Sequence, residues 1–308
     1  MAGELVTGPG LIQWGSLLIG RRQATATITP YRWRTVTGWE ETPALDSGNA
    51  MRAQQHGGWP GRLLAQTRTV TIEGLMLRAA AGQIGAAVRT LNAACTIAQD
   101  EAPLVIWLDD RGPLLVNARL IRRFIPPDLS WQQGYAAGGA LQFQATDPRR
   151  YALAEQSLST ALPAPESGLA WGTPTETGLD WGSPTETGLA WGTTGSTGDM
   201  TVTNSGDAEA HPVIELRGPV TTPTVTTGTG LRLEYDITLA ATDTLVIDTW
   251  AGTVLLGGQS RIATATIRSA PENAFTLPPG TSTLSFRSAP GSTDPGALAT
   301  LRWRSAYW

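Results

Sequence analysis

The stretch RTVTIEGLML, residues 68–77, decides the class of the first half of the chain. Its side chains alternate in character, with Val70 and Ile72 on one face of an extended strand and Thr69, Thr71 and Glu73 on the other. Alternation with a period of two is typical of a β-strand that has one face in a core and one in water. The same kind of pattern in ATATITPYRWRTVTGW, residues 24–39, predicts further strands beside it.

One helix follows this strand. In RAAAGQIGAAVRTLNAACTIAQ an apolar stripe recurs at steps of three and four residues, formed by Ile84, Val88, Leu91 and Cys95, which predicts a helix over about 78–98. Next, PLVIWLDDRGPLLVNARLIRRFIP predicts two strands around a turn at 109–112. We therefore expect residues 1–151 to form a mainly β domain with one helix, interrupted by a long polar loop over 38–63.

The second half contains only strand patterns. Short candidates such as HPVIELRG, DTLVIDTW and STLSFRS recur about every ten to twelve residues, separated by Gly and Pro. This spacing is typical of a β-sandwich or jelly roll. We expect such a domain over 199–308.

A repeat separates the two halves. Residues 168–197 read GLAWGTPTET GLDWGSPTET GLAWGTTGST, three near-copies of ten residues within a connector expected over 152–198. We predict that the side chains of each Leu-x-Trp unit insert into an apolar groove, because burial of one indole contributes a few kcal/mol to binding. The alternative is a duplicated linker whose extra copy has no role. The six interface residues of this prediction are Leu169, Trp171, Leu179, Trp181, Leu189 and Trp191.

The composition limits the kinds of catalytic and binding sites that the chain can contain. The chain has 22 arginines and no lysine, which excludes a phosphate-loop lysine, a Schiff-base lysine and a Ser–Lys dyad. Residues 1–150 carry 15 arginines and 11 acidic residues, whereas residues 151–308 carry 7 arginines and 15 acidic residues. This asymmetry indicates either two surfaces with different partners or two ordinary domains of different composition. We expect no membrane span and no secretory signal.

Few residues are suited to catalysis or metal binding. Only His56, His211 and Cys95 belong to the strongest metal-ligand types, so we expect no metal, no cofactor and no enzymatic activity. The candidates that remain are residues for interfaces. They are His56 and Trp59 in the long loop, and the pairs Arg122–Arg123 and Arg149–Arg150, expected either to pair with acids across a subunit boundary or to face water.

Several motifs occur together along the chain: LLAQTRTVTIEGLML with the helix after it, EAPLVIWLDDRGPLLVNARLIRRF, FQATDPRRY, and then NSGDAEAHPVIELRG, DTLVIDTWAGTVLLGG and LPPGTSTLSFRS. In these motifs and their order the chain resembles the distal tail proteins of long-tailed, siphovirus-type bacteriophages. This resemblance implies a tail-tube-like N-terminal β-barrel with one helix and a galectin-like C-terminal β-sandwich. It also implies that the loop over 38–61 is an arm that reaches a neighbouring subunit.

The resemblance further implies a structural role in the virion. Six copies would form a homo-hexameric ring at the phage tail tip, assembled in the host cytoplasm, that joins the tail tube to the tip or baseplate hub. The partners would be the tail tube protein, tip hub or tail-associated proteins and the tape-measure protein, with DNA only as cargo through the channel and no membrane contact.

Two other functions stay open. A glycan-binding adhesin of the tail tip would use exposed tryptophans, for which Trp250 and Trp303 are the candidates. A decorated tail tube subunit would share the N-terminal fold. A cell-wall hydrolase lacks any catalytic constellation in the sequence.

Overall fold

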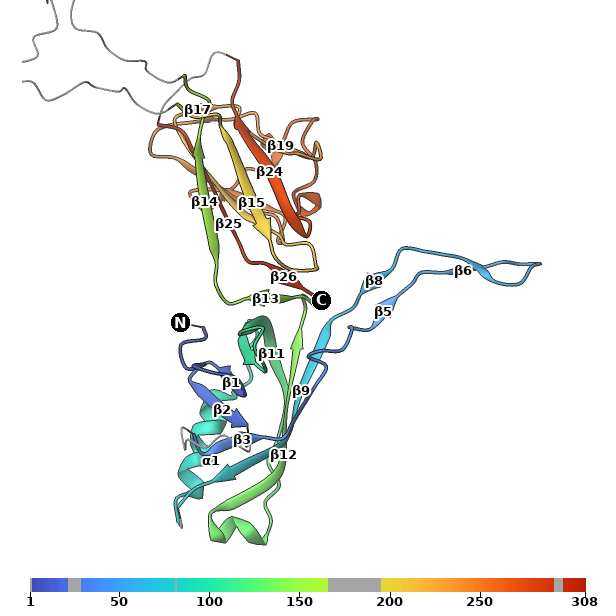
Figure 1. Cartoon of the computed structure of the whole chain (residues 1–308), viewed down its shortest axis with the longest axis vertical. Helices are drawn as coiled ribbons and strands as arrows, with labels where there is room; N and C mark the ends of the chain where they lie inside the picture. Colours follow the sequence, from blue (N-terminus) through green and yellow to red (C-terminus); the bar gives the residue numbers. More distant parts are fainter. Residues whose placement is uncertain (1, 22–28, 81, 166–194, 291–295) are drawn as a thin grey trace, which may run out of the picture. The chain divides into compact units, whose positions relative to one another are not determined.

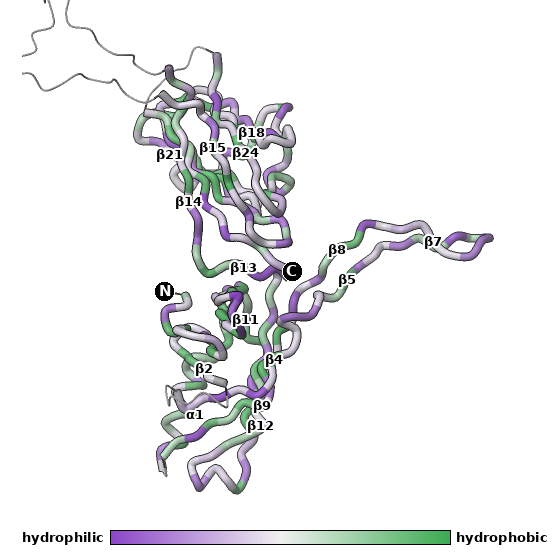
Figure 2. The backbone as a smooth tube through the Cα atoms, in the orientation of Figure 1, coloured by the Kyte–Doolittle hydropathy of each residue, from purple (hydrophilic) through white to green (hydrophobic). Residues whose placement is uncertain are grey.

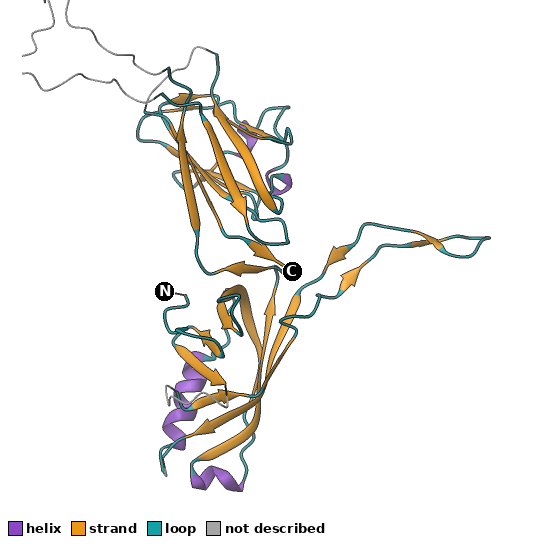
Figure 3. Ribbon diagram, in the orientation of Figure 1, coloured by secondary structure: helices purple, strands orange, loops and turns teal. Residues whose placement is uncertain are grey.

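The computed structural model describes residues 2–21, 29–80, 82–165, 195–290 and 296–308. It consists of two compact units. The first contains Met1–Ala154 together with Ala306–Trp308, and the second contains Glu155–Ser305. The fold is mainly β, as predicted (Figure 3).

A closed sheet forms the centre of the first unit (Figure 1). Its seven strands lie in the order β10 (Ala102–Trp107), β1 (Leu11–Trp14), β2 (Leu17–Arg21), β3 (Tyr31–Trp33), β9 (Arg68–Arg78), β12 (Tyr135–Ala145) and β11 (Leu114–Phe124). The last strand, β11, pairs again with β10, and this pairing closes the barrel. Each neighbouring pair in the ring is antiparallel except β2 with β3.

The alternation that predicted β9 is observed in the barrel. Val70 and Ile72 are fully buried, together with Leu75 and Leu77 farther along the strand. The switch from even to odd positions occurs at Gly74, whose φ of +62° accompanies a register shift against β12. A glycine adopts this left-handed conformation without steric cost, so the strand bends here and keeps its apolar residues inside.

The helix α1 (Ile84–Ala94) is shorter than the predicted 78–98. Strand β9 continues through Arg78, which pairs with Tyr135, so the first residue of the predicted helix belongs to the barrel instead. Gly82, with φ +78°, lies outside the helix directly before its N-cap, Gln83. The helix buries Ile84 and Leu91. A short 3-10 helix, η1 (Leu129–Gln133), precedes β12.

Residues expected to form a long loop are partly a β-ribbon. Two short antiparallel ladders pair β5 (Leu45–Asp46) with β8 (Leu64–Ala65) and β6 (Ala50–Met51) with β7 (Gly58–Trp59). We call residues 40–67 the arm. Strand β4 (Thr35–Thr37), which pairs with β9, leads into it from the barrel. Figure 1 shows the arm as a long two-stranded projection.

The second unit contains two sheets, and their strands carry many of the apolar residues drawn in green in Figure 2. Buried residues alternate with more exposed ones along strands of both sheets. One has the order β14 (Gln156–Ala161), β25 (Leu298–Trp303), β16 (Val213–Arg217), β21 (Thr244–Asp248), β22 (Thr253–Leu256) and β23 (Gln259–Ser260). The other has the order β15 (Asp199–Asn204), β24 (Gly280–Arg287), β18 (Thr224–Thr227) and β19 (Arg232–Glu234). Smaller elements are the ribbon of β17 (Val220–Thr221) and β20 (Thr238–Leu239) and the 3-10 helices η2 (Ile262–Thr264) and η3 (Glu272–Ala274).

The boundaries of the units differ from those expected. Strand β14 lies inside the expected connector over 152–198, but it pairs along its whole length with β25 and so belongs to the second unit. Conversely, β26 (Ala306–Tyr307) pairs with β13 (Arg150–Ala152) in the first unit.

The repeats are therefore an insertion between β14 and β15. Ala164 and Ser196 flank this insertion and exchange two backbone hydrogen bonds of 2.9 and 3.0 Å, which hold its ends together within the second unit. The six predicted interface residues of the repeats, from Leu169 to Trp191, lie outside the described residues.

Candidate assembly site: the arm and its arginine anchor

The arm exposes large apolar side chains. Five of them stand in solvent with 48–83% of their surface exposed: Leu45, Met51, Trp59, Leu63 and Leu64. A two-stranded ribbon without a core is marginally stable in water by itself, and an exposed apolar patch of this kind marks an interaction surface. The arm is therefore suited to bind another protein surface.

Two residues predicted for an interface lie on this arm. The guanidinium carbon of Arg52 lies 4.3 Å from the centre of the Trp59 ring, so a cation–π contact orients the indole. His56 is exposed in the turn between β6 and β7.

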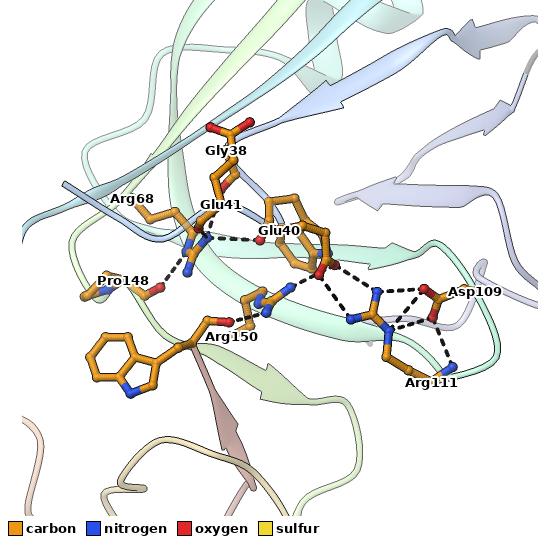
Figure 4. A network of polar contacts seen from close by, with 10 residues as sticks. Gly38, Glu40, Glu41, Arg68, Asp109, Arg111, Pro148 and Arg150 are labelled. Carbon is orange, nitrogen blue, oxygen red and sulfur yellow. Dashed lines mark hydrogen bonds and ion pairs between the residues drawn. The ribbon is translucent and has the colours of Figure 1, made fainter.

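A buried arginine fixes the base of the arm (Figure 4). Arg68 begins β9, and only 1% of its surface is exposed. Its Nη1 donates to the carbonyl oxygens of Gly38, Trp39 and Glu41 at 2.9, 3.0 and 2.8 Å, and its Nε donates to the carbonyl oxygen of Pro148 at 2.6 Å. Burial, which disfavours the charged form, lowers the pKa of Arg68 to about 10, so the side chain stays cationic at neutral pH.

Local backbone geometry makes this anchor possible. Gly38 has φ +76°, and a Cβ atom at this position would lie 1.9 Å from the carbonyl oxygen of Thr69. Only glycine lets the chain turn here and present its carbonyl to Arg68. Charge-assisted hydrogen bonds to buried carbonyls are strong, so both strands at the base of the arm are tied to the barrel.

A second set of contacts centres on Glu40, which accepts hydrogen bonds from two arginines. Nη1 of Arg150 lies 2.9 Å from Oε1, and Nη1 and Nη2 of Arg111 lie 3.1 Å from Oε2 and Oε1. Partial burial alone would raise the pKa of Glu40, but the hydrogen bonds and charges of the two arginines outweigh it and lower that pKa. Arg111 also pairs with Asp109 at 2.6 Å, and Arg150 donates to the carbonyl oxygen of Trp308.

The predicted pair Arg149–Arg150 belongs to this anchor. We expected both side chains to pair across a subunit boundary or to face water, but each is 6% exposed and pairs with an acid of its own chain. Arg149 forms two hydrogen bonds with Asp147, at 2.8 and 3.0 Å, and the hydroxyl of Tyr151 donates to the same carboxylate at 2.5 Å. The motif DPRRY forms a bend that leads into β13, and no local pattern predicts that Glu40 and Arg68 contact it.

The pair Arg122–Arg123 lies elsewhere, at the end of β11. Arg122 is exposed, whereas Arg123 donates from Nη1 to the carbonyl oxygens of Asn92 and Cys95 at the end of α1, at 3.3 and 2.7 Å. The arrangement suits a helix C-terminus, where the last carbonyls lack partners.

The two tryptophans expected for glycan contact differ in exposure. Trp303 is 6% exposed, and its Nε1 donates to the carbonyl oxygen of Thr203 at 3.0 Å, so its ring cannot stack on a sugar. Trp250 is 50% exposed and lies edge-on to the ring of His211, with 5.2 Å between ring centres. Of these two candidate tryptophans, only Trp250 is exposed enough to contact a ligand.

Within the ranges that the structure describes, three or more His, Cys, Asp or Glu side chains nowhere gather in a way that suits a metal ion. Over the same ranges no helix has the length and apolar character needed to cross a membrane.

Residues 205–307 match the family described as Siphovirus-type tail component, C-terminal domain. Part of the second unit is therefore similar to a domain of phage tail components. The predicted localisation in the virion tail is confirmed. No curated protein matches it in sequence.

Among solved structures, the chain is similar to SPP1 Dit (gp 19.1), described as a paradigm of the hub adsorption apparatus in phages that infect Gram-positive bacteria. The TM-score is 0.59 and the identity 13%, over 90% of this chain and 94% of that one. With the family match, this shared fold confirms the predicted resemblance to the distal tail proteins of siphovirus-type phages.

Two structures of the phage P2 baseplate in its activated conformation are also similar. The one with Ca has a TM-score of 0.46 at 10% identity over 90% of this chain and 91% of that one. The one with Sr has a TM-score of 0.47 at 10% identity over 95% and 96%. These scores are too low to add to the assignment of the fold.

Proposed function

We propose that this protein forms the distal ring of a phage tail, a homo-hexamer that joins the end of the tail tube to the tail tip or baseplate hub. The ring surrounds the channel through which DNA passes. Its neighbours are the tail tube protein, the tip hub or tail-associated proteins and the tape-measure protein. The role is structural and not enzymatic, and assembly takes place in the host cytoplasm.

One observation carries the proposal: an arm with five exposed apolar side chains is anchored rigidly to a β-barrel by Arg68. Such an arm has no core of its own and gains one only against another surface. When identical chains bind arm to barrel in the same direction, the contacts are heterologous, and they close into a ring if the rotation permits. The description of SPP1 Dit as a hub protein supports the same role.

Native mass spectrometry over a range of concentrations tests the ring. We expect a species of six times the 32.5 kDa of the chain, seen as closed rings in negative-stain images. The double variant Met51→Ser, Trp59→Ala should lose this species without a change in melting temperature, because both side chains are exposed in the single chain. Leu129→Ser is the matched control, since Leu129 is 93% exposed on η1 and outside the arm.

Two other outcomes would speak against the proposed ring. A chain that stays monomeric at every concentration and does not bind the ends of purified tail tubes would contradict the ring. Open tubes in the images, instead of closed rings, would favour a decorated tail tube subunit.

A glycan-binding adhesin is the second candidate, and the exposed side chain of Trp250, which lies edge-on to the ring of His211, favours it. An exposed indole offers a flat face for a sugar ring. Binding of the full chain to a glycan array, lost in Trp250→Ala and retained in Trp308→Ala, would establish it. Trp308 is the matched control because it is similarly exposed, at 44%.

A further inference from the structure

A groove lined by apolar and basic side chains lies between the end of α1 and the end of β11, and we call its two arginines, Arg122 and Arg123, the rim. Its volume is about 420 Å³. The α1 side contributes Asn92, Cys95, Thr96 and Ile97, and the β11 side contributes the run from Leu120 to Arg123. Ile97 is 96% exposed and Ile121 is 50% exposed, so two large aliphatic side chains stand in water at one site.

The backbone of β11 is shaped to present these residues. Leu120 pairs with Phe143 and Arg122 with Gln142, which leaves Ile121 without a partner on β12. This extra residue is a β-bulge, a feature that redirects side chains and is common beside functional sites. Arg123 fixes the other wall, because it bonds to the last carbonyls of α1.

The rim of the groove carries positive charge. Among the described residues neither Arg122 nor Arg123 forms an ion pair, in contrast to Arg111, Arg149 and Arg150. A surface that combines exposed isoleucines with unneutralised arginines is complementary to a segment with large apolar side chains and carboxylates.

The chain's own sequence contains such a segment. The repeats over 168–197 carry three Leu-x-Trp units with Glu176, Asp180 and Glu186 and have no basic residue. The arm also exposes apolar side chains, but the charged residues nearest in sequence to Met51 and Trp59 are Arg52 and Arg62, so this part of the arm is not complementary in charge to the rim.

We propose that the groove binds the acidic Leu-x-Trp repeats of a second copy of the chain. The indole and leucine side chains lie against Ile97 and Ile121, and the carboxylates pair with Arg122. The repeats would then add a second contact between neighbouring copies, separate from the arm. This contact does not depend on the number of copies in the assembly.

A peptide titration tests the binding chemistry. The probe is a labelled peptide of residues 175–192, TETGLDWGSPTETGLAWG. Fluorescence anisotropy is measured with the full chain in which Trp171, Trp181 and Trp191 are replaced by alanine, so that its own repeats do not compete. We expect binding that weakens with salt and is at least tenfold weaker for Ile121→Ser and for Arg122→Glu. A peptide with both tryptophans replaced by alanine should not bind.

Leu129→Ser is the matched control, an exposed leucine outside the groove. If Leu129→Ser binds the peptide with the same affinity as the parent chain, the proposal is supported. The absence of peptide binding at millimolar concentration would overturn it, and so would an equal loss in Leu129→Ser and Ile121→Ser.

Disulfide trapping tests the occupant. In a Cys95→Ala background, Ile97→Cys is combined with Gly182→Cys in one chain and with Met51→Cys in another. We expect oxidised dimers in the first chain and none in the second. Only intrachain bonds in the first chain, or dimers only in the second, would overturn the proposal. Native mass reports on the ring independently, so the failure of one proposal is distinguishable from the failure of the other.

Discussion

The Nε atom of Arg68 lies 2.6 Å from the carbonyl oxygen of Pro148, although the two residues are 80 positions apart in the sequence. This hydrogen bond joins the start of β9 to the DPRRY turn. A second donor atom of the same guanidinium, Nη1, binds three carbonyls at the start of the arm. One buried side chain therefore joins the base of the ribbon to the barrel, beside the ion pairs of Glu40.

Arg68→Met tests this anchor. The substitution keeps the apolar stem but removes the donors to four carbonyl groups, of which those of Trp39 and Pro148 are buried. A buried group that loses its partner costs about 1–3 kcal/mol, so we expect the free energy of unfolding to fall by about 3 kcal/mol in urea denaturation. Arg62→Met, at an exposed arginine of the arm, should change it by less than about 0.5 kcal/mol. Equal stability of the two variants would show that the anchor does not hold the arm.

Glu40→Gln tests the ion pairs that Glu40 forms with Arg111 and Arg150. The effect of this substitution on the free energy of unfolding should depend on pH. The folded chain holds the pKa of Glu40 below its ordinary value of 4.5. Stability from this group is therefore present above the pKa of the unfolded chain and is lost as the pH falls through the folded pKa. Because the carboxylate is partly exposed, we expect the variant to lose about 1 kcal/mol at pH 7.

The difference between Glu40→Gln and the parent chain should then shrink as the pH falls below 4.5. Urea denaturation of both chains from pH 3 to pH 7 measures it. A difference that stays constant with pH would assign the effect to the shape of the side chain and not to its charge.

The reactivity of Cys95 reports on the wall of the groove. Burial raises the pKa of this thiol to about 11, against the opposing charge of Arg123, and only 2% of the residue is exposed. At pH 8 we expect iodoacetamide to modify it about 100-fold more slowly than a free cysteine, because the thiolate is the nucleophile. Ile97→Cys in a Cys95→Ala background is the control and should react rapidly, since Ile97 is 96% exposed. Equal rates would mean that the end of α1 opens readily.

Deletion of one repeat, residues 178–187, should leave the stability of the single chain unchanged. The ends of the insertion are held by the Ala164–Ser196 bridge within the second unit, and the cost of closing a loop changes by only about 0.6 kcal/mol when its length doubles. Thermal unfolding measures this effect. A fall in melting temperature of more than a few degrees would show that the repeat packs against its own chain.

The periodicity of the sequence was sufficient for much of the fold. Val70 and Ile72 are buried as their alternation predicts, and the stretch over 103–126 forms the β10–β11 hairpin. Such features are local, because a strand shows its buried face through neighbouring residues. The same local signal misplaced the start of α1, since the run from Arg78 to Ala80 suits a helix but β9 pairs with β12 through Arg78.

Contacts between residues far apart in the sequence determined the features of the fold and of the site that local patterns do not predict. The sequence placed Arg149 and Arg150 in a motif but could not show that Glu40, 110 positions from Arg150, accepts its hydrogen bond. Nor could it show that β14 pairs with β25, which turns the expected connector into an insertion. By itself the sequence determined the mainly β class, the repeats and the resemblance to distal tail proteins. The tertiary structure decided where the arm is anchored, which acids Arg149 and Arg150 pair with and where the repeats are inserted. The physical reason is that hydrogen bonds and ion pairs join groups that are close in space, and only the folded chain determines which groups those are.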